Sequence, residues 1–330
     1  MELFQGLIVS AILLGCMYTL VAIGFSLFFG VMDVVVFCCG DIAILGSFVI
    51  MGTWVVMQSA RLPLPFVVCV VILILIGALA CASLGLLTYR VSIKPFHESS
   101  ELMPLLSTIA MGTVIKEVLG LLFKPVVDSL SSAVAPPGES ALTVTSGRNP
   151  QGFPEILELL LPGDGPEMLS GLLDSRKVAV IVITVVILTL LFLFLSRTKM
   201  GLSMQAIAQN KELSLMIGVN VSKVIVVTFV IGGIMLAISG FLMGNYQKLM
   251  SFDNGAMYGA KGFSAAVVGG LRNTWGAVVG GMLLAFVEVF VAGYVPRGMA
   301  YANIVAFIVV VIFIIFKPEG IIGEKFVEKV

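Results

Sequence analysis

The chain has 330 residues, of which 59% are hydrophobic and 12% are charged, about half the charged share of an ordinary soluble protein. Nineteen basic residues balance nineteen acidic residues, which excludes a basic nucleic-acid-binding surface. A single histidine and five scattered cysteines exclude a His/Cys metal cluster. The mean hydropathy of +1.13 predicts a polytopic membrane protein whose apolar surface contacts lipid.

Apolar runs long enough to cross a bilayer as helices, which takes about 20 residues each, recur along the chain. They lie at 6–29, 34–57, 66–88, 103–123, 178–196, 224–244, 275–294 and 301–316, and a shorter glycine-rich run at 255–271 is either a ninth span or a re-entrant segment. Because the backbone must satisfy its own hydrogen bonds in lipid, and no barrel-like alternation is present, these runs predict helices. We expect one all-α transmembrane helix bundle over residues 1–330, with eight to nine hydrophobic segments.

Basic residues in the loops predict the orientation. The stretch 89–102 contains Arg90, Lys94 and His97, and the stretch 197–223 contains four basic residues against Glu212, whereas 124–177 is net negative. We therefore expect 89–102 and 197–223 in the cytoplasm, 124–177 outside, and the N-terminus outside. The C-terminus is cytoplasmic if 255–271 crosses fully, which Arg272 directly after it favours. Apolar patches at 156–161 and 168–173 suit either docking of a soluble binding protein or capping of the outer mouth of the bundle.

The 35 glycines include three GxxxG spacings, Gly240–Gly244, Gly255–Gly259 and Gly276–Gly280. Such spacing predicts close helix packing, and glycines also permit the discontinuous helices of transporters. All five cysteines lie within apolar runs, so we expect them to be small interface fillers rather than disulfides.

A short amphipathic helix is predicted within 197–223. Asn210 can cap a helix over 211–217 that Gly218 ends in the left-handed conformation. Leu213, Met216 and Ile217 then share one apolar face. That face either docks into a groove on a partner or lies on its own bundle or the lipid interface.

Ionisable side chains inside spans are expensive and therefore need partners or a wet cavity. Asp41, the adjacent Lys116 and Glu117, Lys261 and Glu288 are of this kind. Lys116 and Glu117 point about 100° apart on a helix and need separate partners. We interpret these charges first as structural pairs, Glu288 with Lys261 or Lys116, and second as groups that gate or steer a zwitterionic substrate. Asp33, between the first two spans, is predicted to be a turn residue.

The residues Glu212-Leu-Ser-x-x-x-Gly218 resemble the E-A-A-x-x-x-G signature of permease subunits in ATP-binding-cassette importers. That resemblance implies a coupling helix that docks into an ATPase subunit, and it assigns the coupling role to a group of six residues. The group is Glu212, Leu213, Ser214, Met216, Ile217 and Gly218.

Longer segments resemble the branched-chain amino-acid permeases of the high-affinity leucine/isoleucine/valine system, in particular the first of the two paired permeases. They are Gly15-x-x-Tyr-x-Leu-x-Ala-x-Gly24, Phe37-x-x-Gly-Asp-x-x-x-x-Gly-Ser-Phe48, the run from Lys261-Gly-Phe-Ser through Trp275 to Glu288, and Lys317-Pro-Glu-Gly-Ile-Ile-Gly. The resemblance covers nearly the whole chain except 124–177. One departure is that the family's Asn-Phe-Ala-His-Gly reads Val36-Phe-Cys-Cys39-Gly here, which implies a drier path or a different substrate.

The resemblance implies a bacterial inner-membrane permease that moves branched-chain or related small amino acids by alternating access. Its expected partners are a second permease, two cytoplasmic ATPases, an extracytoplasmic substrate-binding protein and the lipid bilayer, with no nucleic acid. We expect no cofactor, metal or catalytic residue in this chain, because it lacks a phosphate-binding loop and ATP would bind the partner subunits. Candidate residues of the substrate path are Phe37, Asp41, Lys261, Phe263 and Glu288. The alternatives are a stand-alone secondary transporter or channel, or an importer permease for urea or a sugar.

Overall fold

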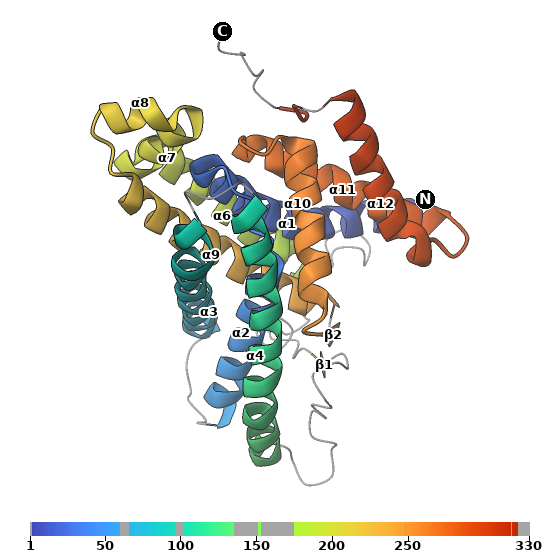
Figure 1. Ribbon diagram of the computed structural model, residues 1–330. Coiled ribbons are helices and arrows are strands. Elements are labelled where there is room, and N and C mark those ends of the chain that lie inside the picture. Colours follow the sequence, from blue (N-terminus) through green and yellow to red (C-terminus); the bar gives the residue numbers. More distant parts are fainter. Residues whose placement is uncertain are drawn as a thin grey trace. The chain divides into compact units, whose positions relative to one another are not determined.

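The computed structural model describes residues 2–59, 66–96, 102–134, 151–152, 175–247, 249–317 and 319–322. Within these ranges the regular elements are helices and one two-residue strand pair, joined by short turns and connections (Figure 1). The α-helices are α1 (Glu2–Met32), α2 (Cys39–Ser59), α3 (Phe66–Thr88), α4 (Leu102–Val134), α6 (Ser175–Arg197), α7 (Lys199–Gln209), α8 (Lys211–Met216), α9 (Val221–Gln247), α10 (Asn254–Gly269), α11 (Thr274–Tyr294) and α12 (Gly298–Phe316). One π turn (Tyr89–Ile93) and one 3-10 turn (Lys94–Phe96) follow α3. The apolar patches at 156–161 and 168–173 lie outside the described residues.

Among the described residues, six helices are long and apolar enough to cross a membrane, which makes this a multi-pass membrane protein. They are Phe4–Met32, Val68–Phe96, Leu102–Phe123, Lys177–Arg197, Val221–Gln247 and Thr274–Tyr294, and shorter apolar helices lie at Cys39–Trp54 and Ala300–Phe316. The glycine-rich run becomes α10, an unbroken helix of 16 residues. At 1.5 Å per residue it is about 24 Å long, short of the roughly 30 Å hydrocarbon core. The all-helical class is confirmed, and the count of eight to nine segments stays a prediction.

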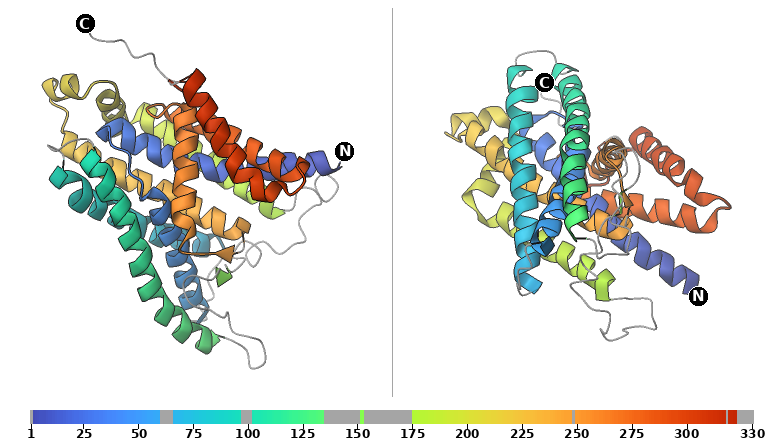
Figure 2. Two further views of the ribbon diagram at one scale, coloured as in Figure 1. Left: turned by 45° about the vertical axis from the view of Figure 1, so that its right-hand side comes forward. Right: turned by 90° about the horizontal axis from the view of Figure 1, so that it is seen from below.

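One compact unit contains Met1–Val35, Gly163–Thr228 and Lys261–Val330. In this unit α1 and α11 lie side by side along most of their lengths (Figure 2). Glycine permits the approach, since a methyl group at Gly281 would come within 2.7 Å of the Thr19 backbone. The Thr19 hydroxyl donates a hydrogen bond across this contact to the Val278 carbonyl at 3.3 Å. Close helix packing therefore accounts for glycines of this unit, as the spacing predicts.

The second unit contains Val36–Pro162 and Phe229–Ala260. Here α2 packs against α3 and α4, and the Cys81 thiol donates to the Ile42 carbonyl at 3.3 Å. The rings of Phe48, Phe123 and Phe252 form a cluster, with 4.4 Å between the Phe48 and Phe252 centroids. Strands β1 (Gln151–Gly152) and β2 (Leu249–Met250) pair antiparallel. All five cysteines of the chain are buried and form no disulfide, as predicted.

Two element boundaries differ from the sequence-based ones. The second span was expected to begin at 34, but residues 33–38 are not helical and α2 starts at Cys39. Asp33 has a positive φ of 56°, which ends α1 and confirms the predicted turn. The outer loop was expected to begin at 124, but α4 continues to Val134. Extending an existing helix adds one hydrogen bond per residue without a new nucleation cost, so its end does not follow hydropathy alone.

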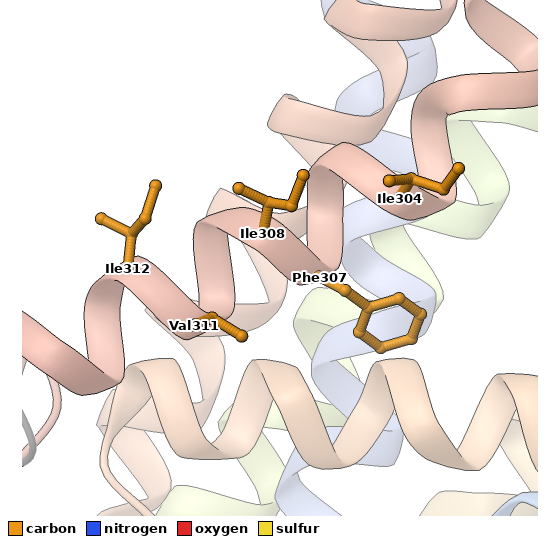
Figure 3. A pocket seen from close by; sticks show the side chains of 5 residues that line it. All are labelled: Ile304, Phe307, Ile308, Val311 and Ile312. Carbon is orange, nitrogen blue, oxygen red and sulfur yellow. The ribbon is translucent and has the colours of Figure 1, made fainter.

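The last helix, α12, presents a row of branched apolar side chains (Figure 3). Ile304, Ile308 and Ile312 project to one side of α12, with half of each side chain exposed, and Phe307 projects to the other. Together with Val311 they line a shallow groove of about 420 Å³. An exposed aliphatic row of this kind is the surface expected of a helix that contacts lipid.

Candidate functional site

Helix α8 is held in place by its own ends. The Asn210 side chain accepts a hydrogen bond from the Leu213 amide at 3.1 Å, and the Ser214 hydroxyl donates to the Asn210 carbonyl at 2.8 Å. At the other end, Gly218 has a φ of +85° and its amide donates to the Leu215 carbonyl at 3.0 Å. The predicted cap at Asn210 and the predicted left-handed Gly218 are therefore both confirmed. Because these interactions are local, they could be inferred from neighbouring residues alone.

The outer surface of α8 is apolar and uncovered. Leu213, Met216 and Ile217 are 59%, 82% and 76% exposed, whereas Ser214 is buried against the protein. Leu215, which the sequence analysis left out of this group, is 54% exposed as well. Glu212 is also exposed, in the first turn of the helix. This surface, defined here as Glu212, Leu213, Leu215, Met216 and Ile217, is called the α8 surface below. A short helix that exposes so much apolar area is typical of a docking element.

A buried ion pair connects α10 and α11. The Lys261 ammonium lies 2.6 Å from Oε1 of Glu288, with side-chain exposures of 11% and 14%. The Tyr18 hydroxyl of α1 accepts from Lys261 at 2.9 Å and donates to Oε2 of Glu288 at 2.9 Å. The pairing of Glu288 with Lys261, rather than with Lys116, is thus the correct alternative. Tyr18 was not predicted as part of this group, although a tyrosine in an apolar span needs a hydrogen-bond partner.

The other predicted path residues lie in different surroundings. Phe263 packs against Phe25, with 5.8 Å between ring centroids, in the same unit as Lys261 and Glu288. Phe37 and Asp41 belong to the second unit. There the Phe37 amide donates to the Thr108 hydroxyl at 3.4 Å. The structure therefore brings Lys261 and Glu288 together and places Phe37 and Asp41 in a separate group.

Asp41 sits in a narrow space in the second unit. Its carboxylate lies so close to α4 and α10 that a methyl group at Gly112 would come within 2.4 Å of Oδ2, and one at Gly255 within 2.2 Å of Oδ1. Lys116, one helical turn from Gly112, forms an ion pair with Asp253. Glu117 is exposed. The prediction that the two adjacent charges need separate partners is thus supported for Lys116 and stays a prediction for Glu117. The partner Asp253 could not be read from spacing.

Val36 and Cys39, the positions where the resembling family has Asn and His, are both fully buried. They lie on the short connection before α2 and at its first residue. Their apolar side chains fill closed space in this structure, so polar replacements there would have to find hydrogen-bond partners in the interior.

Comparison with known proteins decides the family. Residues 7–314 match the family model described as the permease component of the branched-chain amino acid transport system. The chain belongs to this family. It is a membrane permease component of a transport system, not an enzyme.

Individual relatives of this family match along almost their entire length. The chain is 27% identical over 330 residues to the high-affinity branched-chain amino acid transport system permease protein BraD of Pseudomonas aeruginosa, covering 98% of this chain and 97% of the relative. It is 26% identical to the LivH protein of Escherichia coli, covering 97% and 96%, and 23% identical to a probable LivH of Methanocaldococcus jannaschii, covering 95% and 91%. No solved structure is significantly similar to this chain. Nearly the whole length of the chain therefore aligns with permease proteins of this family.

Proposed function

We propose that this chain is the membrane-spanning permease subunit of an ATP-binding-cassette importer, in which separate ATPase subunits drive alternating access. The family assignment supports a permease that works within a multi-subunit system rather than a stand-alone transporter or channel. The α8 surface supports the coupling role, because it exposes apolar side chains on a helix that local caps hold in position. This surface is the observation that carries the proposal.

Docking of α8 would supply the energetic link to the ATPases. Full burial of side chains such as Met216 and Ile217 contributes about 1.5–3 kcal/mol each. The negative charge of Glu212 in the first turn interacts favourably with the N-terminus of the helix. The same charge would attract basic groups on a partner. The coupling residues are Glu212, Leu213, Ser214, Met216, Ile217 and Gly218, and Leu215 joins them because it is exposed beside them. Closure of the ATPases around ATP would then displace α8 together with the helices attached to it.

The remaining subunits and the orientation follow from the same proposal. A second permease, two cytoplasmic ATPases that bind the ATP, and an extracytoplasmic substrate-binding protein complete the importer. Residues 197–223 and the C-terminus face the cytoplasm, and 124–177 and the N-terminus face outside, which the distribution of basic residues supports. In this arrangement α10 crosses the membrane as a short ninth segment.

The proposed cargo is a branched-chain or related small amino acid. The relatives BraD and LivH are named as permeases of high-affinity branched-chain amino acid transport systems, which supports this substrate class. Phe37, Asp41, Lys261, Phe263 and Glu288 remain the candidate residues of the path. Val36 and Cys39 replace the family's Asn and His. If these two buried positions line the path in relatives, this chain has a drier path or a somewhat different substrate.

Substitution of Gly218 in the assembled importer tests the proposal. No atom of the described residues lies within 4 Å of a methyl group placed at Gly218, so the cost of a side chain there is backbone strain. Gly218→Val should strain the left-handed backbone, displace α8 and abolish leucine uptake, while Gly218→Asn, which tolerates this conformation, should retain most of it. The measurement is uptake of leucine, urea and a sugar by proteoliposomes with all partner subunits. Normal uptake and normal ATPase stimulation in Gly218→Val would contradict the coupling role of α8.

A further inference from the structure

The turn between α10 and α11 carries an arginine that contacts two other helix ends of the same unit. Arg272 donates through Nη1 to the Ala208 carbonyl at 3.2 Å, and its Nη2 forms an ion pair with Asp33. Its guanidinium also lies 6.0 Å from the centroid of the Phe29 ring. Asp33 and Phe29 belong to the end of α1, and Ala208 belongs to the last turn of α7. One side chain therefore joins α1, α7 and the α10–α11 turn.

The contact at Ala208 is close to α8 in the chain. The last four carbonyls of a helix have no partner within that helix, and a cation near them is favourable. Arg272 supplies both a donor and a positive charge to one of these carbonyls. Asn210, two residues after Ala208, is at once the C-cap of α7 and the N-cap of α8. A displacement of α8 therefore reaches the Ala208 carbonyl through a single shared cap residue.

The backbone turn that carries Arg272 is held firmly between α10 and α11. The next residue, Asn273, caps α11 by accepting from the Trp275 amide at 2.9 Å, and its Nδ2 donates to the Ile322 carbonyl at 2.9 Å. The backbones of α10 and α11 touch beside it, because a methyl group at Gly269 would come within 2.0 Å of the Gly276 carbonyl oxygen. The turn thus moves as one piece with both helices.

A cavity borders both α7 and this turn beside the arginine. The cavity has a volume of about 970 Å³ and lies within the first unit. Its walls include Gln205, Ala208 and Gln209 of α7 on one part and Gly270–Thr274 of the turn on another. Where a cavity borders both elements, dispersion contacts between them are reduced, so the hydrogen bond to Ala208 carries a larger share of their coupling.

We propose that Arg272 is a positioning residue that transmits displacement of α8 through α7 to α10 and α11. The proposal rests on the proposed docking of the α8 surface to an ATPase. The helices that receive the displacement carry Lys261 and Glu288, and α1, which Arg272 also contacts, carries Tyr18. Arginine suits this role because its planar fork makes two directed bonds at once, which a lysine ammonium does less well. The side chains of Arg272 and Asp33 are 42% and 51% exposed, so their pair contributes little to folding stability.

Arg272→Gln in the complete importer tests the proposal. The variant should still insert, co-purify with the ATPases and hydrolyse ATP, while the amount of leucine transported per ATP hydrolysed falls by about five-fold or more, the lower end of ordinary coupling energies. Arg272→Lys should recover part of this ratio. The matched control is Arg297→Gln, an exposed arginine in the turn at the other end of α11, which should leave the ratio unchanged.

Two results would overturn the proposal: an unchanged transport-to-ATP ratio in Arg272→Gln, or loss of ATPase co-purification in that variant. The second would show that Arg272 places α8 for docking instead of transmitting its movement. If the docking proposal itself is wrong, Gly218→Val should show normal leucine uptake and normal ATPase stimulation, whatever the result for Arg272→Gln. Failure of the docking proposal can therefore be told apart from failure of the Arg272 proposal.

Discussion

The ammonium nitrogen of Lys261 on α10 lies 2.6 Å from the carboxylate of Glu288 on α11, and the Tyr18 hydroxyl hydrogen-bonds to both charges. The three groups hydrogen-bond to one another in a largely buried place, with side-chain exposures of 11% for Lys261 and 14% for Glu288. Such mutual satisfaction is what a structural ion pair requires in the membrane interior. The pair that the structural interpretation predicts is therefore present. A role of either residue in the substrate path stays a proposal.

We therefore expect the charges to be replaceable together but not singly. Lys261→Met leaves Glu288 buried without its cation, which costs about 3–5 kcal/mol in buried pairs, so expression and thermal stability should fall. Adding Glu288→Leu removes the stranded charge and should restore both expression and leucine uptake. The measurements are membrane yield, unfolding temperature in detergent, and uptake in proteoliposomes.

A well-expressed but inactive double variant would instead show that one of the two side chains lines the substrate path. Tyr18→Phe serves as the accompanying control, since it removes only the hydroxyl. Hydrogen bonds to charged groups contribute about 1.5–3 kcal/mol, so this variant should lower the unfolding temperature and leave uptake per molecule nearly normal.

The space around Asp41 predicts opposite effects for two glycines of α4. Gly112→Ala would place a methyl group 2.4 Å from Oδ2 of Asp41, so the variant must displace the carboxylate or the helix, at an overpacking cost of about 1–3 kcal/mol. In Gly120→Ala the new methyl group finds only the Phe252 ring, at 3.9 Å. That variant should be stabilised by about 0.5–1 kcal/mol through helix propensity.

Unfolding temperatures of the two purified variants in detergent check this prediction. Both substitutions add a methyl group to a glycine of α4, so they differ in the atoms that surround the new methyl group. Equal effects of the two variants would show that the close approach of Gly112 and Asp41 does not constrain the folded protein.

The proposed orientation predicts the side from which cysteines react. In a background without the five native cysteines, Arg148→Cys should react with an impermeant thiol reagent in intact cells. Leu215→Cys, whose parent side chain is 54% exposed on α8, should react only after the membrane is permeabilised.

Labelling of living cells followed by mass shift of the purified subunit is the measurement. The reverse pattern, position 215 reacting from outside, would place α8 on the wrong side for a cytoplasmic ATPase. That result would overturn both the orientation and the coupling role.

The sequence by itself determined the features that depend on neighbouring residues. Apolar runs without strand-like alternation predicted helices, because a backbone in lipid must satisfy its hydrogen bonds internally. Asn210 and Gly218 predicted the ends of α8, because caps act within a few residues of the chain. The motifs through Glu212, Lys261 and Glu288 also indicated the family that residues 7–314 match.

Only the tertiary structure decided which distant groups meet. Glu288 had two possible cations, and the packing of α10 on α11 selected Lys261, while Lys116 paired with Asp253. No pattern in the sequence predicted the hydrogen bond from Arg272 to the Ala208 carbonyl, since that contact depends on where α1 and α7 end in space. These pairings arise from helix packing at glycine contacts, and spacing along the chain carries no information about which helices become neighbours.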